Sequence, residues 1–66
     1  MIITISEILF NSTNKAYYEI RPQYYTDGTI EFEVYYRYRE DCDWTYETTK
    51  KTRVSAIKYI KNKGVE

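Results

Sequence analysis

The sequence of 66 residues lacks histidine and contains a single cysteine, Cys42. Histidine is the most frequent acid–base catalyst near neutral pH, and one thiol cannot close an internal disulfide. Cys42 is flanked by Glu40, Asp41 and Asp43, whose negative charge opposes thiolate formation, and one cysteine among carboxylates is not a zinc-binding set. We therefore expect a protein that is not an enzyme and that has no catalytic residue, no metal site and no cofactor.

A long apolar segment is also missing. Residues 1–5, Met-Ile-Ile-Thr-Ile, contain no basic n-region and are too short for a signal peptide or a membrane span. We expect a cytoplasmic protein without membrane contact, folded as one domain over residues 1–66. A domain of this size buries only roughly 60% of its unfolded surface. Because neither a disulfide nor a metal supplements so small a core, we expect a homodimer.

Tyrosine, by contrast, is abundant, with nine residues of which eight lie between positions 17 and 46. This content favours strands. Apolar and polar residues alternate along the same stretch, which predicts a three-stranded antiparallel meander at about 15–25, 29–39 and 43–50. The even-numbered positions are predicted to face the core and the odd-numbered positions to face solvent. The predicted core positions include Ala16, Tyr18, Ile20, Val34, Tyr36, Trp44 and Tyr46.

The first turn of the meander follows from this alternation. Opposed residues of an antiparallel pair share a face of the sheet. A three-residue loop at 26–28 with Gly28 in the left-handed region obeys this rule, because it pairs Tyr24 with Ile30. Pro22 cannot donate a ladder hydrogen bond, which predicts that the first strand lies at the edge of the sheet.

The second turn obeys the same rule and is predicted to have an odd number of residues. A three-residue loop at 40–42 satisfies it, and a five-residue loop is equally allowed. The loop at 40–42 places Tyr36 near Tyr46 and Tyr38 near Trp44.

The C-terminal segment predicts a helix at 53–63 that lies across the even-numbered face, so the fold class is α+β. Thr52 can cap the start of this helix and Gly64 can end it. Its apolar arc consists of Ala56, Ile57 and Ile60, with Val54 and Tyr59 on the flanks.

The N-terminal segment allows two interpretations. Residues 3–6 alternate in the manner of a short strand. Residues 4–7, Thr-Ile-Ser-Glu, also form a capping box that is followed by apolar residues at helical spacing. We favour a short helix that ends before Asn11, with a short strand as the alternative.

Charge is unevenly distributed, although the net charge is zero. Residues 1–49 hold nine acidic and four basic residues, whereas residues 50–65 hold six basic residues and no acidic one. Such an asymmetry indicates an electrostatic contact surface. The start of the predicted helix attracts anions such as phosphate through its free N–H groups and its dipole. The candidate anion- or nucleic-acid-binding residues are Thr49, Lys50, Lys51, Arg53 and Lys58; the alternative is a capped helix whose lysines only keep the chain soluble.

The odd-numbered face supplies a second candidate surface. Tyr17, Tyr35 and Arg37 have no core to enter there, and exposed tyrosine and arginine are frequent in binding hot spots. We assign these three residues to a candidate protein interface. Two alternatives stay open: the tyrosines could stack on bases, or they could form cross-strand pairs that only stiffen the sheet.

Residues 49–57, Thr-Lys-Lys-Thr-Arg-Val-Ser-Ala-Ile, follow the meander and resemble the Ser-Lys-Lys helix start of double-stranded RNA-binding domains. With a helix near the N-terminus, the resemblance covers about residues 4–63. It implies that Lys50 and Lys51 contact phosphates across the major groove and that Glu7 lies on the minor-groove helix. The Gly-x-Gly and Pro-x-His motifs of that family are absent here.

Two further resemblances concern the layout alone. The meander followed by a helix resembles the arm-binding domain of tyrosine integrases, which implies a sheet that reads DNA through Arg21, Arg37 and Arg39. Size and composition resemble small uncharacterised prophage proteins of the YopT type, which implies a dimer.

We predict a non-catalytic binding protein that self-associates and has no small-molecule substrate. The alternative is a nucleic-acid-binding module that contacts phosphates through the start of the C-terminal helix. A third class is an inhibitor that presents its acidic sheet to a basic site on another protein.

Overall fold

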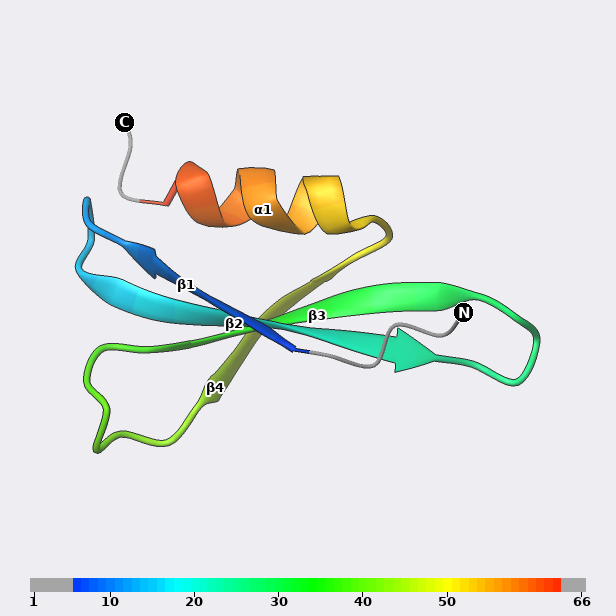
Figure 1. The fold of residues 1–66 in the computed structure, drawn as a ribbon, viewed down its shortest axis with the longest axis horizontal. Helices are drawn as coiled ribbons and strands as arrows, with labels where there is room; N and C mark the ends of the chain where they lie inside the picture. Colours follow the sequence, from blue (N-terminus) through cyan, green and yellow to red (C-terminus); the bar gives the residue numbers. More distant parts are fainter. Residues whose placement is uncertain (1–5, 64–66) are drawn as a thin grey trace.

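A computed structural model describes residues 6–63 of the chain (Figure 1). Four strands form an antiparallel meander in the order β1-β2-β3-β4, and one helix follows. The helix lies over β2, β3 and β4 on one side of the sheet. The predicted α+β class is confirmed, although the sheet has four strands where the sequence predicted three. The elements are β1 Glu7–Asn11, β2 Ala16–Tyr24, β3 Ile30–Arg37, β4 Thr45–Lys50 and α1 Arg53–Lys61.

The additional strand is β1, and it corrects the helix that we favoured for the N-terminal segment. β1 pairs with β2 so that Leu9 lies opposite Tyr18 and Phe10 lies opposite Tyr17. A helix of two turns is unstable alone, whereas the strand gains a ladder of hydrogen bonds with β2. The part of the expected helix or strand at residues 1–5 lies outside the described residues.

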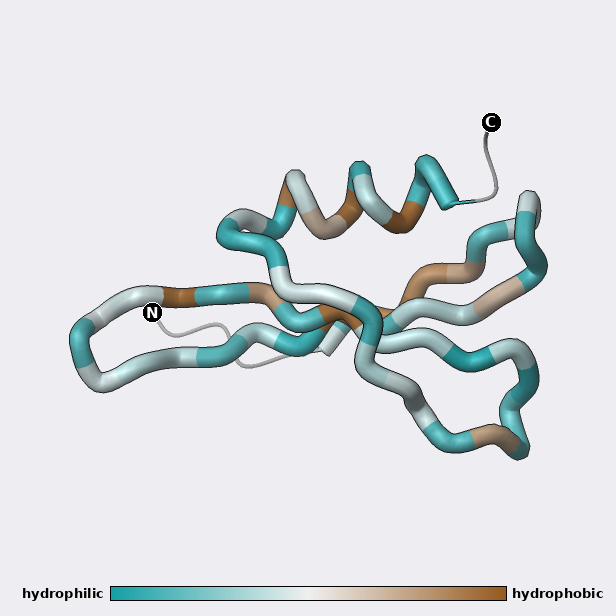
Figure 2. Tube along the Cα trace, turned by 180° about the vertical axis from the view of Figure 1, so that it is seen from behind, coloured by the Kyte–Doolittle hydropathy of each residue, from teal (hydrophilic) through white to brown (hydrophobic). Residues whose placement is uncertain are grey.

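The core lies between α1 and the sheet. Its buried residues are Ala16, Tyr18, Ile20 and Val34 from the strands and Ala56 and Ile60 from the helix. Figure 2 shows the hydrophobic positions of α1 on the side that faces the sheet. The even-numbered face is therefore confirmed as the core at the centre of β2 and β3. Tyr24 and Ile30 are 38% and 43% exposed, because a helix of nine residues spans only about 14 Å.

The turn between β2 and β3 confirms the predicted register. Tyr24 pairs with Ile30, and Gly28 has a φ of +91°, in the left-handed region. The amide of Gly28 donates to the carbonyl of Tyr25 at 3.0 Å, and the amide of Tyr25 donates to the carbonyl of Thr29 at 3.0 Å. Glycine suits this position because a side chain there is strained by the positive φ.

The prediction that Pro22 marks an edge strand is wrong, because β2 lies between β1 and β3. The described part of β1 begins at Glu7, which pairs with Ile20, so this ladder stops before it reaches Pro22. On its other side Pro22 pairs with Phe32 of β3. The proline is thus tolerated within a central strand at a position that the described pairing of β1 does not reach.

The pairing of β3 with β4 corrects the predicted second turn. The register shifts between Val34 and Tyr35, so that Tyr46 lies opposite Tyr35 instead of near Tyr36. The connection comprises residues 38–44, which is longer than the predicted loops. The irregularity leaves Glu47 without an opposite residue in β3, and an extra residue of this kind moves the following side chains to the other face.

The bulge also relocates two aromatic side chains that were expected in the core. The ring of Tyr46 packs on that of Tyr35 at a centroid distance of 5.7 Å, on the side of the sheet away from the helix. Trp44 lies against the guanidinium of Arg37, 4.3 Å from the ring centroid.

The helix begins as predicted. The side chain of Thr52 accepts a hydrogen bond from the amide of Ser55 at 3.1 Å and so forms the N-cap. The helix ends at Lys61 with Asn62 as its C-cap, two residues earlier than expected, and Gly64 lies outside the described residues. Val54 is 64% exposed and does not flank the core, which corrects its predicted place.

Candidate functional site

The side of the sheet opposite α1 is the main candidate surface, and we call it the outer face. None of the described elements lies on it, and Ile8, Phe10 and Tyr46 are 60%, 55% and 53% exposed there. The strand register aligns outward-facing residues into rows that cross the sheet; one such row runs from Ile8 through Glu19 and Tyr35 to Tyr46. The residues of the outer face are Ile8, Phe10, Tyr17, Glu19, Arg21, Gln23, Glu31, Glu33, Tyr35, Arg37, Trp44, Tyr46 and Thr49.

Aromatic rings of the outer face pack in pairs across neighbouring strands. Phe10 of β1 and Tyr17 of β2 have ring centroids 5.0 Å apart, and Tyr35 and Tyr46 pair on β3 and β4. Aromatic pairs at such distances contribute about 0.5–1.5 kcal/mol beyond the burial of their area. The outer face therefore presents aromatic side chains that contact one another across neighbouring strands.

The structure brings together the three predicted interface residues, Tyr17, Tyr35 and Arg37, on the outer face. Tyr17 and Arg37 lie directly opposite each other on β2 and β3, and Tyr35 is the next outward residue along β3. Arg37 also donates from Nη1 to the carbonyl of Glu40 at 3.2 Å and so fastens the connection between β3 and β4. Its Nε is buried and has no hydrogen-bond partner among the described residues.

Charges of both signs alternate with these rings. Arg21 forms an ion pair with Glu19, and its guanidinium lies 3.9 Å from the ring centroid of Tyr35. The hydroxyl of Tyr35 donates to Glu33 at 2.9 Å, and this hydrogen bond raises the pKa of the tyrosine. The outer face is thus amphoteric rather than uniformly acidic.

The five residues predicted to bind an anion, by contrast, are not gathered on one surface. Thr49 lies on the outer face, where its hydroxyl is 2.6 Å from that of Tyr46, whereas Lys50 lies on the helix side with its Nζ 4.9 Å from the ring centroid of Tyr59. Arg53 binds Glu7 through two hydrogen bonds of 2.5 and 2.6 Å. The pairing lowers the pKa of Glu7. Lys51 and Lys58 are exposed.

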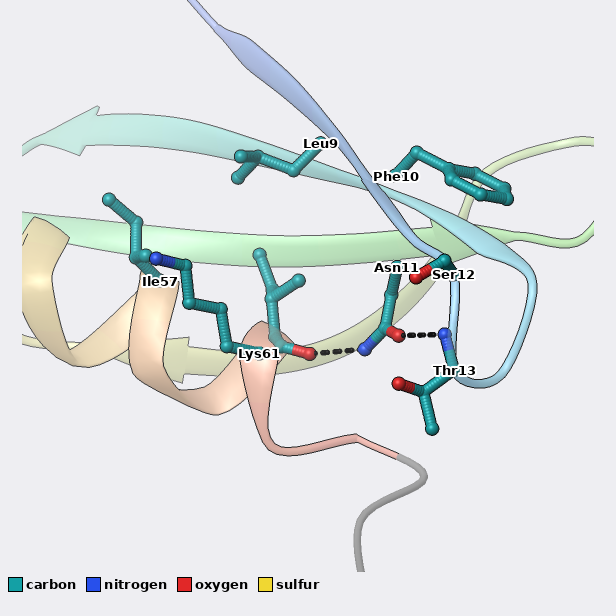
Figure 3. A pocket seen from close by; sticks show the side chains of 8 residues that line it. Leu9, Phe10, Asn11, Ser12, Thr13, Ile57 and Lys61 are labelled. Carbon is teal, nitrogen blue, oxygen red and sulfur yellow. Dashed lines mark hydrogen bonds between the residues drawn. The ribbon is translucent and has the colours of Figure 1, made fainter.

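Asn11 was missed by the sequence analysis, which treated it only as the start of a loop. Its Nδ2 donates to the carbonyl of Ile60 at 2.6 Å, and its Oδ1 accepts from the amide of Thr13 at 2.8 Å (Figure 3). The same Nδ2 also donates to the carbonyl of Lys63 at 3.1 Å. The side chain thereby connects the β1–β2 turn to the last turn of α1. Nothing in the local sequence indicates a bond across 49 residues.

A groove lies beside Asn11, between β1 and α1 (Figure 3). Its volume is about 220 Å³. Leu9, Ile57 and Ile60 provide apolar walls, and Lys61 lies at the helix side of the groove. The other lining residues are Phe10, Asn11, Ser12 and Thr13.

Glu47 was also missed, because the bulge that directs it toward α1 was not predicted. Its Oε1 accepts from the hydroxyl of Tyr59 at 2.7 Å and lies 2.6 Å from Nζ of Lys63. The hydrogen bond from Lys63, followed by that from Tyr59, lowers the pKa of Glu47 against the opposing effect of burial. Burial, together with the bond to Glu47, raises the pKa of Tyr59. The cluster fastens the end of α1 to β4.

Within residues 6–63, no three His, Cys, Asp or Glu side chains are grouped so that they could hold a metal ion. No helix there is long and apolar enough to cross a membrane.

Comparison of the chain with protein-family models, with curated proteins and with solved structures found no match.

Proposed function

We propose that the chain is a non-catalytic interaction protein that self-associates, with the outer face of one copy packed against the outer face of a second. One observation carries the proposal: an entire side of a four-stranded sheet, which carries aromatic and arginine side chains in contact with one another, is covered by no described element. Antiparallel sheets often have one solvated face, but that face is then mostly polar. Here Phe10 and Ile8 are more than half exposed.

A second copy is a suitable occupant because the outer face carries both members of the required charge pairs. Arg21 and Arg37 lie among Glu19, Glu31 and Glu33, so a two-fold rotation can set arginine against glutamate. A stable interface buries about 800 Å² on each partner, which is roughly one sixth of the 5038 Å² surface of this molecule. One side of the sheet can supply an area of this size.

Nucleic acid is less well supported as the occupant. The three glutamates of the outer face would repel a phosphate backbone, and Arg53 at the start of α1 is already neutralised by Glu7. Among the predicted phosphate contacts, Lys51 and Lys58 are exposed, but they alone make a small electrostatic footprint.

Sedimentation equilibrium over a range of protein concentrations tests the proposal. We expect association in the micromolar range, and we expect Tyr46→Ser to weaken it by about tenfold or more, because aromatic anchors dominate interfaces. Tyr38→Ser is the matched control, since Tyr38 is 59% exposed but lies beyond the outer face, in the β3–β4 connection. A chain that stays monomeric at hundreds of micromolar, or equal effects of the two variants, would contradict the proposal. Binding of single-stranded RNA or DNA that Tyr46→Ser abolishes would assign the outer face to nucleic acid instead.

A further inference from the structure

Within residues 6–63, β1 forms an edge of the sheet that no other strand covers. One side of this strand pairs with β2, and the other side pairs with no strand among the described residues. Exposed edges are usually guarded by lysine, proline or a bulge. β4, the opposite edge, has a register shift and ends in Lys50, whereas β1 has an unbroken register and the residues Glu7-Ile8-Leu9-Phe10-Asn11.

The groove described above continues this edge on the helix side. The helix lies over β2, β3 and β4 and leaves the helix-facing side of β1 partly open, so that Leu9 and Ile57 line the groove (Figure 3). On the other side of the strand, Ile8 and Phe10 are exposed. An added strand would therefore meet apolar side chains on both of its faces. It would also lie near Lys61, which is exposed and forms no ion pair within residues 6–63.

We propose that the groove and the edge take β1 of a second copy, added antiparallel to the first so that the two sheets become continuous. A two-fold axis through Leu9, perpendicular to the sheet, sets Leu9 against Leu9 and Ile8 against Phe10 of the second copy. The unpaired N–H and C=O groups of both edges then satisfy each other. The two Leu9 side chains lie on the helix side, where they extend the apolar walls formed by Leu9 and Ile57.

The charges favour a second copy as the occupant. In this register Glu7 of the second copy lies opposite Asn11, and Asn11 and Lys61 line the same groove. Glu7, Leu9 and Asn11 alternate onto the helix side of the strand, so the carboxylate is on the same side as Lys61. Arg53 of its own copy already binds this carboxylate, but the Glu7 side chain is 39% exposed and its oxygens can accept further hydrogen bonds, so Lys61 can bind it as well. The occupant that the groove requires is thus extended, apolar on both faces and acidic at one end, and β1 itself has this chemistry.

This contact is independent of the proposed function, which concerns the outer face. The two-fold axis of the edge contact is perpendicular to the sheet, whereas the axis of a face-to-face contact lies parallel to it. The two axes are compatible in a closed assembly of four copies. Each contact can therefore fail without the other.

Hydrogen exchange measured by NMR at low and high protein concentration tests the edge contact directly. In a single copy, alternate amides of β1 point away from β2 and exchange quickly; in the edge-paired form all β1 amides are protected. We expect this protection to appear as the concentration rises. We expect Lys61→Glu to raise the dissociation constant about three- to tenfold. Lys58→Glu is the matched control, because Lys58 is exposed on the same helix and does not line the groove.

The outcomes separate the two proposals. If Tyr46→Ser abolishes all association and alternate β1 amides exchange quickly at every concentration, the edge contact is wrong and the outer-face contact stands. If Tyr46→Ser has no effect while Lys61→Glu weakens an assembly with protected β1 amides, the edge contact stands and the proposed function is wrong. A monomer at every concentration overturns both. An acetylated peptide of residues 6–12 should shift the β1 amide resonances and dissolve the edge contact. If the peptide bound while the full chain stayed monomeric at every concentration, a second copy would be excluded as the occupant of the edge.

Discussion

The two sides of the sheet are built from similar residues but have different surroundings. On the helix side Tyr18 is 2% exposed and belongs to the core, whereas on the outer face Tyr46 is 53% exposed. Ile20 on β2 and Ile8 on β1 differ in the same way, at 1% and 60%. The difference depends on α1, a helix of nine residues that covers one side only. In so small a protein the role of a tyrosine or an isoleucine is set by the covering element rather than by the residue type.

The sharpest test of this comparison is a pair of identical substitutions on the two sides. Ile20→Ala should lower the free energy of unfolding by about 2–5 kcal/mol, because it removes a buried side chain and leaves a cavity between the sheet and α1. Ile8→Ala should leave the unfolding free energy of the monomer within about 0.5 kcal/mol, since its side chain is exposed. Denaturant unfolding at low protein concentration measures both. A similar loss in the two variants would show that the outer face is not open in the monomer.

Asn11 is the polar residue that joins the sheet to the end of α1. Asn11→Ala should lower the unfolding free energy by about 1–3 kcal/mol, because the carbonyls of Ile60 and Lys63 lose a donor in a buried position. Ser12→Ala, in the same turn but exposed, serves as the control and should have little effect. Hydrogen exchange of the last turn of α1 should accelerate in the asparagine variant alone. Equal stability of the two variants would mean that the amide does not hold the helix.

How far the sequence could predict the fold depended on whether the relevant rule was local. The turn at 26–28 was predictable, because strand alternation and Gly28 act within a few residues and together leave one register. The bulge at Glu47 was not, because a single extra residue carries no sequence signal of its own and reverses the faces of Tyr46 and Trp44. The strand β1 depends on pairing with β2, which overrides a capping box that favours a helix.

Of the two candidate sites, the one on the outer face could be predicted from local rules and the anion site could not. Tyr17, Tyr35 and Arg37 could be grouped from the sequence, because β2 and β3 pair without interruption and odd positions share one face. The same reasoning could not show whether the candidate anion-binding residues lie close together. Adjacent residues of a strand point to opposite sides, which separates Thr49 from Lys50, and Arg53 is bound by Glu7 from the other end of the chain.

The smallest expected effect is a difference in acid sensitivity between one carboxylate on the helix side of the sheet and one on the outer face. Glu47 accepts hydrogen bonds from Lys63 and Tyr59, and these bonds hold its pKa below the ordinary value of 4.5. A carboxyl group whose pKa is lowered by folding stabilises the folded state above that ordinary value, and the contribution is lost as the pH falls through the lowered pKa. The unfolding free energy of the wild type should therefore decline below about pH 4.5, and Glu47→Gln should flatten that decline in part while lowering stability at pH 7. Glu7, whose pKa is lowered by the hydrogen bond from Arg53, accounts for part of the decline that remains. Glu33→Gln on the outer face, where the carboxylate accepts only from Tyr35 among the described groups, should preserve the decline. If Glu33→Gln flattened the decline as strongly as Glu47→Gln, the attachment of α1 to β4 would not be the acid-sensitive element, and the two sides of the sheet would not differ in their response to acid.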